Sequence, residues 1–176
     1  MDKQAEDLKI VTTLVKELEA KGFILTLVGG MALVSMGSQR VTYDFDFLLS
    51  LQDGAIDKIT EVFYNKDFEL ITKLNAQGEV IRTIDNKNIA AARLKIDEPQ
   101  SALFYRHKRE LRIDLLFDFP LSAHEIAGRA HEVKIGSQII RVASSEDLLQ
   151  LKEMAFKDRG LSTDAQDIEF LKKQKR

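Results

Sequence analysis

The sequence of 176 residues contains no cysteine, and this absence removes several classes of function at once. Without thiols the chain can form no disulfide scaffold, no thiol nucleophile and no cysteine-based zinc or iron–sulfur site. Its three histidines, His107, His124 and His131, lack the close spacing that is typical of metal ligands. No Gly-x-Ser-x-Gly elbow is present, so the sequence does not predict a serine hydrolase.

Long hydrophobic runs and a strong net charge are also missing. The longest nearly apolar stretch, 23–37, is too short to cross a bilayer and is interrupted by two glycines, so we expect it to lie in a protein core. The start of the sequence is not basic, which predicts no signal peptide, and the lack of cysteine is compatible with a cytoplasmic protein. A formal net charge of −2 predicts no general attraction to nucleic acid or to a membrane surface.

The most informative stretch is 44–49. Acidic and apolar side chains alternate there, which predicts a strand with Phe45 and Phe47 on a buried face and Asp44 and Asp46 on the other. Two carboxylates held side by side repel each other by roughly 4 kcal/mol at about 4 Å in a partly polar medium. A divalent cation offsets this repulsion, and Mg²⁺ prefers carboxylate oxygen. The alternative is an amphipathic strand whose aspartates are simply solvated.

A pair of glycines precedes this strand. The pattern predicts a short buried strand over 24–28, then Gly29 and Gly30, then a helix over 31–36. The missing β-carbons let an anion approach the backbone, and a helix N-terminus favours negative charge, so the segment can seat a phosphate. A plain tight turn is the alternative. The segment is not a P-loop or a dinucleotide fingerprint, because neither Gly-Lys-Ser/Thr nor Gly-x-Gly-x-x-Gly occurs.

Three further residues are candidates for the same site. Arg40 and Thr42 come just ahead of them, where a guanidinium can meet a phosphate, although a surface arginine is an equally good interpretation. The stretch 110–119 predicts another strand, and Asp114 in it is costly to bury unless it is paired or bound to a metal. If this strand lies beside 44–49, Asp114 completes a cluster of three carboxylates.

The remaining elements follow from periodicity and turn signals. Helical spacing predicts helices over 3–20, 53–65 with Asp53 as N-cap, 121–129, 144–160, and one that begins with a capping box at 163–166. Alternation predicts strands over 79–84 and 89–96 around a turn at 85–88, and a hairpin over 133–140. Arg159 and Asp164 are expected to form a salt bridge between the last two helices.

Two sets of residues resemble a known family. The first set comprises Gly29-Gly30, Asp44-Phe45-Asp46-Phe47, which follows after thirteen intervening residues, and the later Ile113-Asp114-Leu115. It resembles the pattern of the nucleotidyltransferase superfamily, in which two glycines are followed by Asp-x-Asp and then by a third carboxylate on a separate strand. The second, Ser144–Leu149 followed by Lys152, Arg159, Asp164 and Asp167, resembles the closing motif of AbiEii-like nucleotidyltransferases of type IV toxin–antitoxin systems. The likeness covers most of the chain from Leu27 to Leu171.

The resemblance implies an α/β (α+β) nucleotidyltransferase fold, with a small mixed sheet, flanking helices and a C-terminal helical pair. The catalytic domain would span 1–142, and 143–176 would form a helical appendage packed on it. The implied reaction transfers a nucleoside monophosphate from an NTP to an acceptor hydroxyl and releases pyrophosphate. The implied cofactor is Mg²⁺, as two ions.

The resemblance also assigns roles to residues. Asp44, Asp46 and Asp114 would be the catalytic carboxylates and the ligands of the two Mg²⁺ ions. A further set would bind the nucleotide: Gly29, Gly30, Arg40, Thr42 and Lys152. For Lys152 the alternative is an ordinary surface lysine.

The acceptor stays open among tRNA, protein and a small molecule. A toxin-like enzyme that modifies tRNA or protein predicts a basic rim around the site and a cognate antitoxin as partner. An aminoglycoside-type enzyme predicts an acidic pocket for a cationic acceptor. A module that binds nucleotide or metal without turnover is the alternative of another class.

Overall fold

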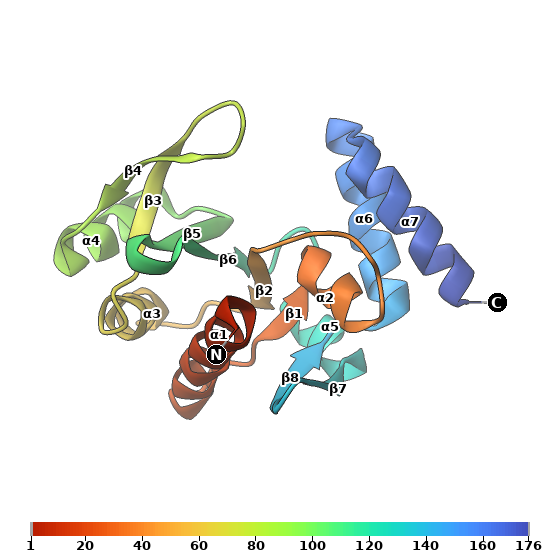
Figure 1. The fold of residues 1–176 in the computed structure, drawn as a ribbon. Coiled ribbons are helices and arrows are strands. Elements are labelled where there is room, and N and C mark those ends of the chain that lie inside the picture. The colour runs from red at the N-terminus through yellow and green to blue at the C-terminus, as the bar shows by residue number, and fades with distance from the viewer. Residues whose placement is uncertain (1, 176) are drawn as a thin grey trace.

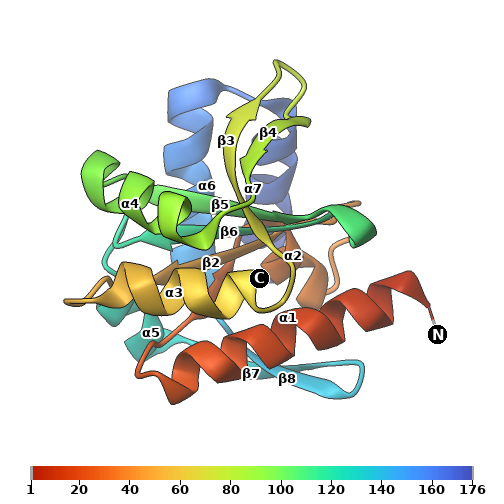
Figure 2. The same ribbon diagram turned by 90° about the vertical axis from the view of Figure 1, so that its left-hand side faces the viewer.

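Eight strands form one mixed sheet in the computed structural model, which describes residues 2–175, and helices cover both of its faces (Figures 1 and 2). The strand order is β4-β3-β5-β6-β2-β1-β8-β7. The strands are β1 (Thr26–Val28), β2 (Phe45–Leu49), β3 (Glu69–Leu74), β4 (Val80–Ile84), β5 (Ser101–Arg106), β6 (Leu111–Phe117), β7 (His131–Ile135) and β8 (Gln138–Val142).

Seven α-helices and one short 3-10 helix accompany the sheet within residues 2–175. They are α1 (Lys3–Ala20), α2 (Gly29–Ser35), α3 (Ala55–Tyr64), α4 (Lys87–Asp97), η1 (His107–Arg109), α5 (Ala123–Arg129), α6 (Ser145–Arg159) and α7 (Ser162–Gln174). Helices α1 and α3 lie on one side of the central strands, and the C-terminal pair α6 and α7 lies on the other (Figures 1 and 2). None of the helices in this part of the chain combines the length and apolar character of a membrane span.

The central strand β2 determines where the carboxylate of Asp46 lies. It runs parallel to β6 and antiparallel to β1, and Asp46 is the register partner of both Asp114 and Val28. The expected pairing of the two acidic strands is therefore confirmed. Because Gly29 directly follows Val28, the glycine turn and the carboxylate strands meet at one place in the sheet.

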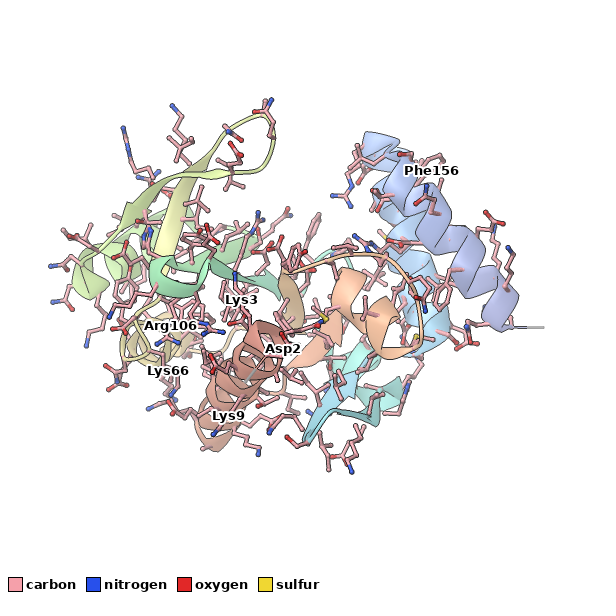
Figure 3. All side chains as sticks on the ribbon, in the orientation of Figure 1. Asp2, Lys3, Lys9, Lys66, Arg106 and Phe156 are labelled. Carbon is pink, nitrogen blue, oxygen red and sulfur yellow. The ribbon has the colours of Figure 1, made fainter. Side chains whose placement is uncertain are left out.

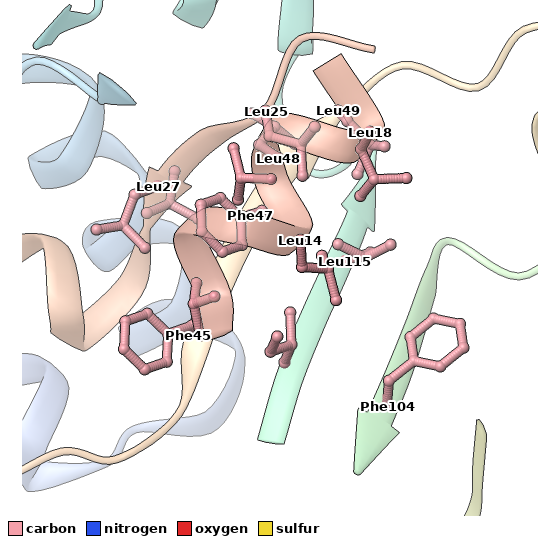
Figure 4. Packing of buried hydrophobic residues seen from close by; sticks show 14 of the residues in the cluster. Leu14, Leu18, Leu25, Leu27, Phe45, Phe47, Leu48, Leu49, Phe104 and Leu115 are labelled. Carbon is pink, nitrogen blue, oxygen red and sulfur yellow. The ribbon is translucent and has the colours of Figure 1, made fainter. Parts of the chain in front are cut away.

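The core explains why these strands hold their register. Phe47 is fully buried and Phe45 is 3% exposed, in the same cluster as Leu14 and Leu18 of α1 (Figure 4). A one-residue slip of β2 would move this apolar set to the opposite face, so burial of the phenylalanines specifies the face on which Asp46 lies.

Three local predictions are wrong. Residues 89–96 are not a strand but belong to α4, because Asn86 accepts bonds from the amides of Asn88 and Ile89 as an N-cap and a run of strong helix formers follows. Strand β4 pairs instead with β3, a segment whose residue pattern is ambiguous between helix and strand. Gly54, not Asp53, is the N-cap of α3, and α7 begins at Ser162 without a side-chain cap, so the capping box is absent.

Other predicted elements are confirmed. Helix α1 has the expected bounds, β7 and β8 form the hairpin, and α6 begins after Ser144 and ends before Gly160. The side chain of Ser144 accepts a bond from the amide of Asp147, which is the reason that α6 begins there.

Candidate active site

The turn between β1 and α2 brings the backbone into direct contact with a carboxylate. Gly29 has a φ of +68°, and a β-carbon built on it would lie 2.2 Å from Oδ2 of Asp46. Any other residue would meet both backbone strain and a collision at this point. The glycine therefore allows the carboxylate of Asp46 to lie against the turn.

The three predicted carboxylates come together on one face of the sheet. Asp46 and Asp114 are neighbours on adjacent strands, which lie about 4.8 Å apart, and Asp44 precedes Asp46 by two residues. Burial raises the pKa of Asp46 to about 7, with further increases from the charges of Asp114 and Asp44 that outweigh the opposing effects of Lys152 and Arg112. Burial also raises the pKa of Asp44 and of Asp114. The ionised forms of all three carboxylates are therefore disfavoured in the cluster.

Sequence reasoning missed the cation that lies nearest to this cluster. Arg112 donates from Nε to Oδ1 of Asp114 at 2.7 Å and from Nη2 to Oδ2 at 2.7 Å. The signal was available, because strand alternation puts residues two apart on one face. Both partners are largely buried, with side-chain exposures of 18% for the arginine and 12% for the aspartate.

Arg40 lies over the second glycine of the turn. A β-carbon at Gly30 would lie 2.8 Å from Cζ of Arg40. The guanidinium is held there by Asp167 of α7, which accepts a bond from its Nη1. The C-terminal helical pair thus fixes the predicted phosphate-binding arginine, through a partner 127 residues away.

Lys152 lies in a buried ionic network rather than on the surface. Its Nζ is 2.9 Å from Oδ2 of Asp167 and 3.5 Å from Oδ1 of Asp164. Asp164 also accepts two bonds from Arg159, at 2.8 and 2.9 Å, which confirms the predicted bridge between α6 and α7. Hydrogen bonding by Arg159 lowers the pKa of Asp164. The interpretation of Lys152 as an ordinary surface lysine is wrong, since the residue is 8% exposed.

Removing the Lys152 ammonium should destabilise the fold. We expect Lys152→Met to lower the free energy of unfolding by about 3 kcal/mol at pH 7, because it leaves two buried carboxylates short of a cation. Urea denaturation checks this against Lys95→Met, which breaks an exposed pair with Asp57 and should cost at most about 1 kcal/mol. Equal losses in the two variants would contradict the network's structural role.

A groove of about 770 Å³ runs beside the cluster. Thr42 and Arg40 line it together with Asp44, and Asp2 and Lys3 reach it from the N-terminal end of α1 (Figure 3). Its charged lining comprises four acidic side chains and two basic ones: Asp2, Asp7, Asp44 and Glu110, with Lys3 and Arg40. A separate pocket of about 340 Å³ shares no lining residue with the groove. Its charged lining comprises Asp67 and three cations, Lys9, Lys66 and Arg106 (Figure 3).

Solved structures with the same arrangement of elements settle the fold. A nucleotidyltransferase-like protein from Paracoccidioides brasiliensis is 16% identical, with a TM-score of 0.58, and the match covers 95% of this chain and 75% of that one. The antibiotic-resistance factor ANT(2'')-Ia is 12% identical, with a TM-score of 0.61 and coverages of 98% and 86%. This chain has a nucleotidyltransferase fold.

A third structure with the nucleotidyltransferase fold is the lincosamide antibiotic adenylyltransferase LnuA, bound to lincomycin. It is 13% identical, with a TM-score of 0.58, and the match covers 95% of each chain. No family model matches the sequence, and no curated protein matches it either. The predicted fold class is therefore confirmed.

The donor set suits the Mg²⁺ that the nucleotidyltransferase fold implies. All three side chains offer carboxylate oxygen, and the repulsion among Asp44, Asp46 and Asp114 favours a bound cation. Within residues 2–175, however, no group of three or more His, Cys, Asp or Glu side chains is arranged to hold one ion. At Asp114 both oxygens are already engaged by Arg112, so its oxygens are available to an ion only after that guanidinium moves.

Proposed function

We propose that the chain transfers a nucleoside monophosphate from an NTP to an acceptor hydroxyl and releases pyrophosphate. The observation that carries the proposal is the position of Asp46, opposite Asp114 in the sheet and directly against Gly29. Three carboxylates beside a turn open to anions offer a site where cations and a triphosphate can neutralise each other. The nucleotidyltransferase fold supports this chemistry.

In this proposal the chain's own groups bind and orient the triphosphate. The glycine turn gives the β- and γ-phosphates access to the backbone at Gly29 and Gly30. Arg40, fixed over the turn by Asp167, contributes a guanidinium that suits phosphate oxygens, and Lys152 approaches from α6. Two Mg²⁺ ions, when bound by Asp44, Asp46 and Asp114, would neutralise the charge that develops on the phosphates.

In the proposed transfer one P–O bond forms and another breaks. The acceptor hydroxyl oxygen forms a bond to the α-phosphorus, and the bond from that phosphorus to the bridging oxygen of the β-phosphate breaks. Pyrophosphate carries away the electron pair of the broken bond. The hydroxyl proton passes to a carboxylate oxygen of Asp114, which acts as the general base.

The acceptor is best matched by a cationic organic molecule. The groove beside Asp44 carries four acidic side chains and two basic ones. Asp7 is paired with Arg109, Glu110 with Lys3, and Arg40 with Asp167. Among residues 2–175, Asp2 and Asp44 are therefore the groove carboxylates without an ion-pair partner. Its lining also includes apolar side chains of Met31 and Leu111. An acidic, partly apolar groove favours a small cationic acceptor, as the aminoglycoside-type alternative predicts. Similar structures include ANT(2'')-Ia in complex with adenylyl-2''-tobramycin, at a TM-score of 0.60 and 11% identity.

The AbiEii-like toxin interpretation is a second candidate, supported by the closing motif in α6 and α7. A tRNA acceptor would need a basic surface, and the pocket lined by Lys9, Lys66 and Arg106 offers one. A cognate antitoxin would be the expected partner of such an enzyme. A variant with all three cations replaced by glutamine should lose activity on RNA and keep activity on a small cationic acceptor.

The transfer itself can be tested with each α-³²P-labelled NTP, Mg²⁺ and cell extract or a panel of cationic small molecules. We expect label in an acceptor with the wild-type protein and none with Asp44→Ala/Asp46→Ala. The labelled species, whether small molecule, RNA or protein, identifies the acceptor class. Metal-dependent nucleotide binding without any transfer would favour the alternative of a binding module without turnover.

A further inference from the structure

Within residues 2–175, the three carboxylates of the cluster differ in what they contact. The side chains of Asp44 and Asp46 take part in no hydrogen bond or ion pair there, whereas both oxygens of Asp114 accept bonds from Arg112. The pair is bidentate, with two bonds of 2.7 Å, and this geometry is the strongest that a guanidinium and a carboxylate can adopt. Two carboxylates of the cluster are thus free, and one is held.

Arg112 is positioned to act on this cluster rather than elsewhere. It belongs to β6, two residues before Asp114, so its side chain leaves the sheet on the same face as the three carboxylates. The charges of Asp114, Asp44 and Asp46 all act on the guanidinium. Because both oxygens of Asp114 accept bonds from Arg112, a cation would have to displace this guanidinium to bind Asp114.

We propose that Arg112 is a positioning residue that holds Asp114 and competes with a divalent cation for it. This inference rests on the proposed function, since it concerns the order in which that site is completed. Asp44 and Asp46, which take part in no ion pair among residues 2–175, would hold a cation first. Asp114 becomes available when Arg112 leaves it, and the triphosphate oxygens of an incoming nucleotide are the anions that can attract the guanidinium away. Nucleotide binding thereby frees the carboxylate that accepts the acceptor's proton.

Binding of Mn²⁺ in the absence of nucleotide tests this directly, measured by calorimetry on the purified chain. We expect Arg112→Gln to bind Mn²⁺ about tenfold more tightly than the wild type, because the competing cation is gone. The gain should vanish in the double variant Arg112→Gln/Asp114→Asn, since it depends on the released carboxylate. Arg141→Gln is the matched control, because it removes a guanidinium–carboxylate pair with Glu19 outside the site and should leave Mn²⁺ affinity unchanged.

A second variant keeps the inference testable if Arg112→Gln folds poorly. Arg112→Lys retains the charge but not the planar fork that holds both oxygens, so its Mn²⁺ affinity should lie between those of the wild type and the glutamine variant. Unchanged or weaker Mn²⁺ binding in folded Arg112→Gln or Arg112→Lys would overturn the inference. A gain in Mn²⁺ affinity that persists in Arg112→Gln/Asp114→Asn would overturn it as well.

Failure of this inference can be told apart from failure of the proposed function. If the wild type transfers a nucleotide but binds Mn²⁺ as tightly as Arg112→Gln, the inference is wrong and the function stands. If the glutamine variant gains Mn²⁺ affinity through Asp114 but no protein transfers a nucleotide, the inference stands and the function is wrong.

Discussion

Replacing Asp46 by asparagine is expected to abolish nucleotidyl transfer and, at the same time, to stabilise the metal-free protein. The carboxylate is half-buried beside Asp114 and Asp44, and desolvation, the largest cause, raises its pKa from the ordinary 3.8 to about 7. Ionising it in the fold therefore costs free energy that a neutral amide of the same shape does not. The same charge is what the proposed cation site requires, so stability and activity should change in opposite directions.

The stabilisation expected of Asp46→Asn depends on pH. Below about pH 4 the carboxyl is protonated in both states, so it contributes no difference. Between pH 3.8 and about 7 the unfolded chain loses the proton while the folded protein keeps it, so the free energy of unfolding falls as pH rises. We expect Asp46→Asn to remove this fall and to be more stable than the wild type by roughly 2–4 kcal/mol at pH 7 to 8.

Urea denaturation with EDTA from pH 4 to 8 measures this difference. Asp57→Asn is a suitable control, because Asp57 is exposed and pairs only with Lys95 among residues 2–175. Stability curves of wild type and Asp46→Asn that stay parallel over this range would contradict the account of the buried carboxylate.

Gly29→Ala is expected to reduce nucleotide affinity at least about tenfold and to cost about 2–3 kcal/mol of stability. Its β-carbon would lie 2.2 Å from Oδ2 of Asp46 in a backbone with a φ of +68°, so either the turn or the carboxylate must shift. Both belong to the proposed site, and a shift of either disturbs the approach of the triphosphate.

Gly54→Ala separates the effect of backbone strain from the effect of the close contact with Asp46. Gly54 has a φ of +73°, but a β-carbon there would have no neighbour within 4 Å. This variant should show the cost of the backbone strain, about 1 kcal/mol, and unchanged nucleotide binding. If Gly29→Ala behaves in the same way as Gly54→Ala, the close approach of turn and carboxylate has no functional role.

The sequence predicts those parts of the site whose placement follows from the pattern of neighbouring residues. Alternation places Asp44 and Asp46 opposite Phe45 and Phe47, and the burial of the phenylalanines then fixes the face. Asp114 follows from the same argument once two strands are assumed to be neighbours. The apolar residues of 89–96 predict a strand, but the Asn86 cap and the alanines that follow it favour helix α4.

The rest of the site depends on contacts between distant segments. Nothing local indicates that Arg40 pairs with Asp167, or that Lys152 lies between Asp164 and Asp167, because these contacts arise only when α6 and α7 pack over the turn. Arg112 is different, since alternation alone puts it on the face of Asp114. It was missed because an arginine in a strand has many other possible partners.

The most direct test of the central claim is equilibrium binding of a non-hydrolysable NTP analogue with Mg²⁺, measured by calorimetry for the wild type and Asp44→Ala/Asp46→Ala. The account predicts Mg²⁺-dependent binding by the wild type, and loss of that binding in a variant that remains folded. Absence of binding in the wild type, or equal binding in both proteins, would contradict it.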